Sequence, residues 1–182
     1  MTIMTLWLPI LVAAVAAFIA GAVIWMAMPW HKTDWNKTSD EEGVRAALKS
    51  TPPGMYTVPN ITYNAEYAKP EVKQKLEEGP QAFITFIPSG MTQMGGKLML
   101  MFVYNLVFAV FCAYFVSRTA SAGADYLAIF RIAGAVAFVA YGMAYIQESI
   151  WFGRSWSLTA KTFVDALIYA VLTGGVFGWL AV

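Results

Sequence analysis

The sequence has few of the residues on which enzyme and metal sites are commonly built. Its 182 residues include one cysteine, Cys112, and one histidine, His31. A single cysteine excludes a disulfide within the chain and any CxxC metal or redox motif. The lone histidine would have to serve every nucleophile–base pair, and no GxSxG, HExxH or phosphate-loop motif occurs. We therefore expect a non-enzymatic protein without a cofactor.

Charge is also scarce, and neither sign dominates. Asp, Glu, Lys and Arg make up 13% of the residues, whereas an ordinary soluble domain has roughly 25%. The 12 basic and 11 acidic residues leave a formal net charge of +1, which provides no basic field for nucleic acid. Apolar residues make up 59% of the chain, and the mean hydropathy is +0.57. This composition is typical of a membrane protein.

Four apolar stretches are long enough to cross a bilayer, which needs about 20 helical residues. They are Leu6 to Trp30, Leu98 to Ser117, Tyr126 to about Gln147, and Thr159 to Val182. The first lacks the basic start and the cleavage segment of a signal peptide, so we expect it to remain as a membrane anchor. The sequence thus predicts an all-α membrane protein, a four-transmembrane-helix bundle with a small α+β insert between helices 1 and 2. Its parts are helix 1 in residues 1–30, the soluble insert in 31–97, and helices 2–4 in 98–182.

The insert has folding signals of its own. In TSDEEGVRAALKS, Ser39 and Glu42 have the spacing of a capping box at the start of a short helix. KPEVKQKLEEG predicts a second helix with Pro70 in its first turn and Gly79 after its end. GMYTVP and QAFITFI are predicted as short strands that can pair. We expect a small folded cap, too small for an independent enzyme domain.

Basic residues are unevenly distributed between the two sides of this predicted membrane protein. Apart from Arg118 and Arg131, every Lys and Arg lies in or beside the insert and the loop between helices 3 and 4. The positive-inside rule therefore predicts a cytoplasmic insert and both termini outside.

Charged residues inside membrane segments are costly and often functional, which makes Asp165 and Arg131 candidates. Each lies about one turn from a predicted membrane edge, so its side chain can reach the headgroup region. The side of the membrane near Asp165 also contains three other charged residues. We therefore predict an interfacial polar cluster of Glu148, Arg154, Lys161 and Asp165. A proton or ion relay at Asp165 is the alternative.

Candidate metal ligands are few. Met91 and Met94 form an MxxM pair, and because thioether sulfur suits Cu(I), these residues and His31 are candidates for a copper site. Methionine is also a flexible apolar filler, and we favour that interpretation. His31 has no neighbours at zinc-ligand spacing, although Asp34 could orient its ring. We predict a solvated histidine where the chain leaves the membrane, and no bound metal.

Small residues recur every four positions along three of the predicted helices, among them the first and the fourth. Ala13, Ala17 and Gly21 do so on the first, and Gly174 and Gly178 form a GxxxG on the fourth. Such stripes let helix backbones approach closely in lipid. They indicate either packing within one bundle or contacts with another membrane subunit or a second copy of the chain.

The layout of the chain resembles a group of small uncharacterised bacterial four-helix inner-membrane proteins. The segments that support the resemblance span nearly the whole sequence and include MPWHKTDW, PPGMYTVPN, GPQAFITFIPSG and FVDALIYAVLTGGVFGWL. The resemblance implies a location in the bacterial inner (cytoplasmic) membrane. The group has no assigned function, so the resemblance implies no site.

Three functional hypotheses follow from these features. The first is an accessory or assembly subunit of a larger membrane complex, whose partners are the lipid bilayer and other membrane-protein subunits. The alternative is a small homo-oligomeric transporter or channel for a small solute, with Asp165, Glu148 and Arg154 near its mouth. The third is copper handling through the methionines and His31.

Overall fold

The chain folds into two compact units, which a computed structural model describes over residues 2–90, 93–121 and 123–181. One unit combines Met1–Trp35 with Gln93–Val182, and the other is Asn36–Thr92. The first holds the long apolar helices, and the second is the insert. Residues 31–35 thus belong to the helical unit, and the insert is shorter than the predicted 31–97.

The helical unit contains four helices long and apolar enough to cross a membrane within the described residues, which confirms the predicted fold class. The first span consists of η1 (Ile3–Leu6), α1 (Trp7–Ala22) and η2 (Val23–Ala27). The second is α4 (Met94–Thr119), which begins one turn earlier than predicted. The third consists of α5 (Tyr126–Phe138), η4 (Val139–Met143) and α6 (Ala144–Trp151), and the fourth is α7 (Trp156–Leu180). The protein is therefore a multi-pass membrane protein.

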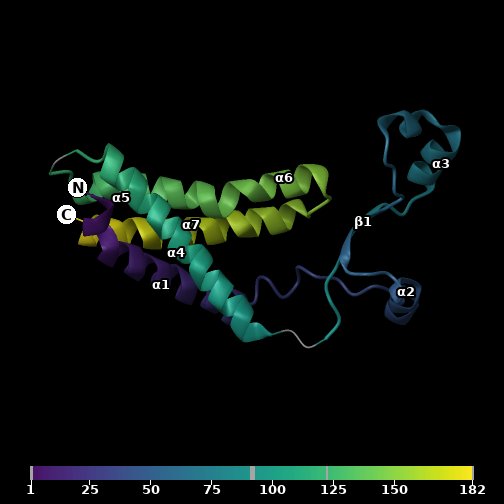
Figure 1. Cartoon of the computed structure of the whole chain (residues 1–182), viewed down its shortest axis with the longest axis horizontal. Coiled ribbons are helices and arrows are strands. Elements are labelled where there is room, and N and C mark those ends of the chain that lie inside the picture. Colours follow the sequence, from purple (N-terminus) through teal and green to yellow (C-terminus); the bar gives the residue numbers. More distant parts are fainter. Residues whose placement is uncertain (1, 91–92, 122, 182) are drawn as a thin grey trace. The chain divides into compact units, whose positions relative to one another are not determined.

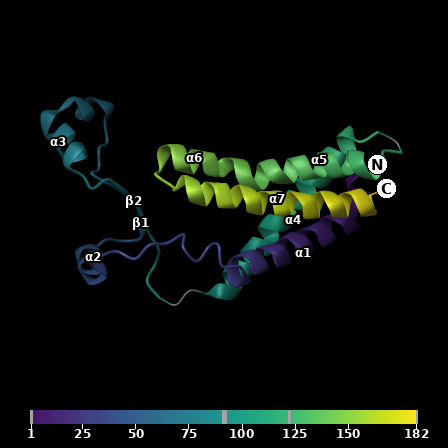
Figure 2. The same ribbon diagram turned by 180° about the vertical axis from the view of Figure 1, so that it is seen from behind.

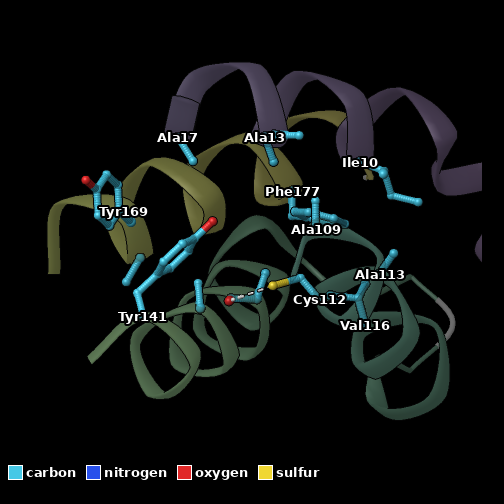
Figure 3. Packing of buried hydrophobic residues seen from close by; sticks show 14 of the residues in the cluster. Ile10, Ala13, Ala17, Ala109, Cys112, Ala113, Val116, Tyr141, Tyr169 and Phe177 are labelled. Carbon is cyan, nitrogen blue, oxygen red and sulfur yellow. Dashed lines mark hydrogen bonds between the residues drawn. The ribbon is translucent and has the colours of Figure 1, made fainter. Parts of the chain in front are cut away.

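The buried core of the four spans combines many alanines with a smaller number of large side chains. Figures 1 and 2 show α5 alongside α7, with both termini at one end of the helical unit. Figure 3 shows Ala13 and Ala17 of the first span beside α7, and it labels Phe177 of α7 and Ala109 of α4 as members of the same buried cluster. Ala13, Ala17 and Phe177 are almost completely buried. The alanines let the helix backbones approach closely at these positions, as expected in lipid.

Two of the spans contain a turn of π-helix. These turns are η2, with Trp25 at its centre, and η4, with Tyr141 at its centre. A π turn inserts an extra residue into an α-helix and often marks a functional position. Both turns matter for the site described below, because Trp25 and Tyr141 line the same cavity.

The insert contains two helices and a two-stranded sheet, as predicted. Its elements are α2 (Glu41–Leu48), β1 (Gly54–Val58), η3 (Asn64–Ala68), α3 (Pro70–Glu78) and β2 (Ala82–Phe86). The strands pair antiparallel, with Tyr56 opposite Ile84. The predicted cap of α2 is wrong by one residue, because Asp40, not Ser39, accepts the backbone hydrogen bond of Gly43 at 2.8 Å. A carboxylate there also interacts favourably with the positive end of the helix dipole.

Candidate functional site

The loop that follows the first span, residues 28–35, folds into two successive turns. The backbone N–H of Lys32 donates to the carbonyl of Pro29, and that of Asp34 donates to the carbonyl of His31. The second turn brings the side chains of His31 and Asp34 together, with 2.5 Å between Nδ1 and Oδ2. The Trp25 ring stacks on the His31 ring at 4.0 Å between centroids and 7° between planes.

His31 also contacts a carboxylate far away in the sequence. Its Nε2 lies 2.9 Å from Oδ2 of Asp165 on α7. Only 6% of His31 and 3% of Asp165 are exposed. The three side chains form a buried Asp34–His31–Asp165 triad, in which each ring nitrogen faces one carboxylate.

The prediction of a solvated His31 is wrong. The sequence showed Asp34 three residues away, but it gave no sign that Asp165, 134 positions along the chain, closes over the other side of the ring. Because both ring nitrogens contact carboxylates, neither is available to a metal ion. Across the described parts of the chain, no group of three or more His, Cys, Asp or Glu residues could hold a metal ion.

Lys161 fixes the loop against α7. Its ammonium donates to Oδ1 of Asp34 at 2.5 Å, to the carbonyl oxygen of Trp30 at 2.5 Å and to the hydroxyl of Thr33 at 3.3 Å. An ammonium has three donors, so this set uses all of them. Lys161 and Asp165 are four residues apart and therefore lie on one face of α7, from which both hold the loop.

Asp34 is buried, yet it stays readily ionised. Burial by itself raises the pKa of the Asp34 carboxyl, but the hydrogen bonds from Lys161 and His31 and their positive charges outweigh that effect. The net result is a pKa below the ordinary value of 3.8. Asp34 thus supplies a fixed negative charge to the triad.

A cavity of about 460 Å³ lies beside the triad, and all four spans contribute to its wall. Five aromatic residues line it: Trp25 and the four cavity tyrosines, Tyr104, Tyr141, Tyr145 and Tyr169. The Tyr141 ring contacts the Tyr169 ring at 4.8 Å between centroids, and its hydroxyl donates to buried Asn105 at 2.8 Å. The polar part of the wall contains Asp165, Thr162, Lys97 and Arg154. An aromatic wall with a few polar groups is typical of a small-molecule site.

Two cations of this wall have no acidic partner among the described residues. The Arg154 guanidinium lies 4.5 Å from the centroid of the Tyr145 ring and donates through Nη2 to Thr162 at 3.1 Å. Its Nε is buried and has no hydrogen-bond partner in the described chain. No ion pair joins Lys97 to another described residue. The cavity wall therefore contains two cations that form no ion pair with a described acidic residue.

Arg154 reaches the cavity because of a short turn between α6 and α7. Gly153 adopts φ +70°, a conformation that favours glycine, and directly follows the end of the helical hydrogen bonding. The backbone N–H of Arg154 then donates to the carbonyl of Glu148. This turn places the arginine beside the first turns of α7, where its guanidinium reaches Thr162.

The members of the predicted interfacial cluster form no direct ion pairs with one another. Asp165 contacts His31, and Lys161 contacts Asp34. The expected ion pair between Lys161 and Asp165 is therefore not formed. Arg154 faces Thr162, and Glu148 is exposed. Sequence spacing on α7 identified two of the participants, but the partner of each came from a loop outside that helix.

The other predicted positions lie away from the triad. Met94 lines an apolar groove between the first span and α4 together with Met26 and Met101, whereas Met91 is outside the described residues. Ala13, Ala17 and Gly21 are buried within the helical unit. Gly174 and Gly178 are buried against α5, near Phe130 and Tyr126. These small-residue stripes are thus used inside one chain.

The fold defines an integral membrane protein of four apolar helices with a small α+β insert and a polar site at the end of its first span. No protein-family model, no curated protein and no solved structure matches the chain.

Proposed function

We propose that this protein is a membrane carrier for a small organic anion with an aromatic or apolar body. The observation that supports this proposal most directly is that Lys97 and Arg154, which form no ion pair with a described residue, both line an aromatic cavity. A carboxylate is the natural acceptor for an arginine that has unused N–H groups. The cavity tyrosines and Trp25 would enclose the apolar body of the same molecule.

The position of the cavity favours transport over simple binding. Its wall takes residues from all four spans, and it lies where the first span ends and the loop 28–35 begins. A site shared between helices changes its access when the helices shift relative to one another. The accessory-subunit and copper hypotheses stay predictions from the sequence, because the described contacts give them no added support.

Equilibrium binding to the full chain in lipid nanodiscs tests the proposal, with radiolabelled benzoate as the probe. We expect saturable binding of benzoate and much weaker binding of benzylamine, which has the same ring but a positive charge. Arg154→Gln should weaken benzoate binding by about 10-fold or more, because a hydrogen bond to a charged group contributes about 1.5–3 kcal/mol. Arg131→Gln is the matched control, since Arg131 is exposed on α5 and is not part of the cavity wall.

Reconstituted vesicles then test transport itself. Benzoate uptake into vesicles that contain the wild-type chain should exceed uptake into vesicles that contain Arg154→Gln, which controls for passive entry through lipid. Preference for benzylamine, or equal binding by wild type and Arg154→Gln, would contradict the proposal.

A further inference from the structure

We propose that the Asp34–His31–Asp165 triad is the proton-binding site of this carrier, and that a proton binds together with the organic anion. This inference rests on the proposed function and names the ion that is coupled to it. It starts from the two contacts of the His31 ring, at 2.5 Å to Asp34 and 2.9 Å to Asp165.

The two contacts set the minimum number of protons in the triad. A ring nitrogen and a carboxylate oxygen form a hydrogen bond only when a proton lies between them. Two such contacts require two protons among one imidazole and two carboxylates, which leaves the triad with a net charge of −1. The ammonium of Lys161, at 2.5 Å from Asp34, balances that charge. The group of four side chains is therefore neutral as a whole.

One atom of the triad has room for a third proton. Oδ1 of Asp165 is buried and has no hydrogen-bond partner in the described part of the chain, although most buried polar atoms have one. A proton taken from water would form an O–H bond at Oδ1, while Oδ2 keeps its contact with His31. No other bond breaks, and the triad changes from −1 to neutral.

That added proton changes the charge that a bound anion meets. Asp165 belongs both to the triad and to the cavity wall that contains Lys97 and Arg154. An ionised Asp165 repels an organic anion held by those cations, and a protonated Asp165 does not. Besides Lys97, Arg154 and the other two members of the triad, the titratable or charged groups near Asp165 are Lys161 and the cavity tyrosines. The anion is thus expected to bind more tightly when the triad holds its third proton.

The coupling is reciprocal, because a proton that favours anion binding is itself favoured by the anion. Anion binding should therefore draw a proton from the solution into the protein. Transport of the anion with that proton moves one negative and one positive charge together, so the pair crosses without net charge.

Proton uptake on anion binding tests the inference. Benzenesulfonate is the probe, since it stays ionised from pH 5 to pH 9 and cannot itself take up the proton. When it is added to the full chain in weakly buffered nanodiscs that contain a pH dye, we expect proton uptake. The affinity should fall by about 10-fold between low and high pH, within the usual range for coupled sites.

Asp165→Asn is the decisive variant, and Glu148→Gln, which removes an exposed carboxylate from the same helical hairpin, is its control. The amide of Asp165→Asn still accepts from His31 but cannot take up a proton. This variant should bind benzenesulfonate at least as tightly as wild type, without proton uptake and without pH dependence. Glu148→Gln should behave as wild type. Because His31 is the only histidine, a ring ¹⁵N spectrum of each variant checks that its triad is intact.

The outcomes separate this inference from the proposed function. Binding of benzenesulfonate or benzoate without proton uptake would overturn the proton coupling and leave the anion carrier standing. Proton uptake that persists in Asp165→Asn with an intact His31 spectrum would also overturn it, because the third proton would then lie elsewhere. Failure of both anions to bind would overturn the proposed function and the coupling with it.

Discussion

Two adjacent glycines on α7 should respond in opposite ways to the same substitution. A Cβ atom at Gly174 would lie 2.8 Å from the backbone oxygen of Phe130 and 3.1 Å from an atom of the Phe130 ring. A Cβ atom at Gly175 would meet only the Tyr126 hydroxyl, at 3.8 Å, which is an ordinary contact. Real Cβ atoms essentially never come within 3.0 Å of a non-bonded heavy atom from another part of the chain. Gly174→Ala must therefore push α5 away from α7, whereas Gly175→Ala need not.

The pair of variants isolates the cost of that clash. Replacing glycine by alanine in a helix contributes up to about 1 kcal/mol through backbone entropy and propensity, and this gain is similar at the two neighbouring positions. Overpacking costs typically about 1–3 kcal/mol. Because a backbone oxygen cannot rotate away as a side chain can, we expect Gly174→Ala to be less stable than Gly175→Ala by about 1–3 kcal/mol.

Reversible unfolding in mixed micelles measures this difference. The purified chain is titrated with sodium dodecyl sulfate, and helix content is followed by circular dichroism for wild type and both variants. Gly175→Ala should match or exceed the stability of wild type, and Gly174→Ala should fall below both. Equal stability of the two variants would refute the close approach of α5 and α7 at Phe130.

Three further predictions concern the loop and the orientation of the chain. Lys161→Met should destabilise the protein by about 1–3 kcal/mol in the same unfolding assay, because it removes one hydrogen-bond partner from the buried Asp34 carboxylate. Lys32→Met changes an exposed lysine and should leave the stability unchanged. Equal effects of the two substitutions would contradict the role of Lys161. The pKa of Asp34 is lower in the folded state than its ordinary value of 3.8. Ionised Asp34 therefore stabilises the fold at any pH above 3.8, and this contribution is lost as the pH falls through the lower pKa of the folded state. The stability difference between wild type and Asp34→Asn should therefore be constant near neutral pH and shrink in acid, and a difference that grows in acid would reverse the assigned sign. The positive-inside rule predicts that residue 121 lies outside the cell and residue 39 in the cytoplasm. In a Cys112→Ala background, a membrane-impermeant maleimide should therefore label Ser121→Cys but not Ser39→Cys in intact bacterial cells. The opposite labelling pattern would show the opposite orientation.

The membrane fold follows from the sequence because its causes are local. A run of about 20 apolar residues predicts a span wherever it occurs, and the four runs correspond to the four apolar helices of the structure. Pro70 and Gly79 likewise mark the ends of α3 through their own backbone preferences. The error at the start of α2 has the same local character, since Ser39 and Asp40 are neighbouring residues that can each cap a helix.

The site could be predicted only in part, because the contacts of the loop with α7 join segments that are distant in the sequence. The sequence identified Asp165 and Lys161 as charges near a membrane edge, and it placed Asp34 three residues from His31. It could not show that one turn of α7 would hold both His31 and Asp34, which lie 127 or more positions earlier. The cavity was equally hidden, since its wall combines residues of four spans whose facing sides periodicity does not specify.

The sequence by itself determined that this is a four-span membrane protein with a small folded insert, because bilayer thickness and local backbone preferences act on consecutive residues. Tertiary structure alone decided that the only histidine is buried between two carboxylates, and that two cations share a cavity without an acidic partner among the described residues. The physical reason is that the charge state of a side chain depends on the groups packed against it. Those groups come together only when the helices pack and the loop 28–35 folds back onto α7.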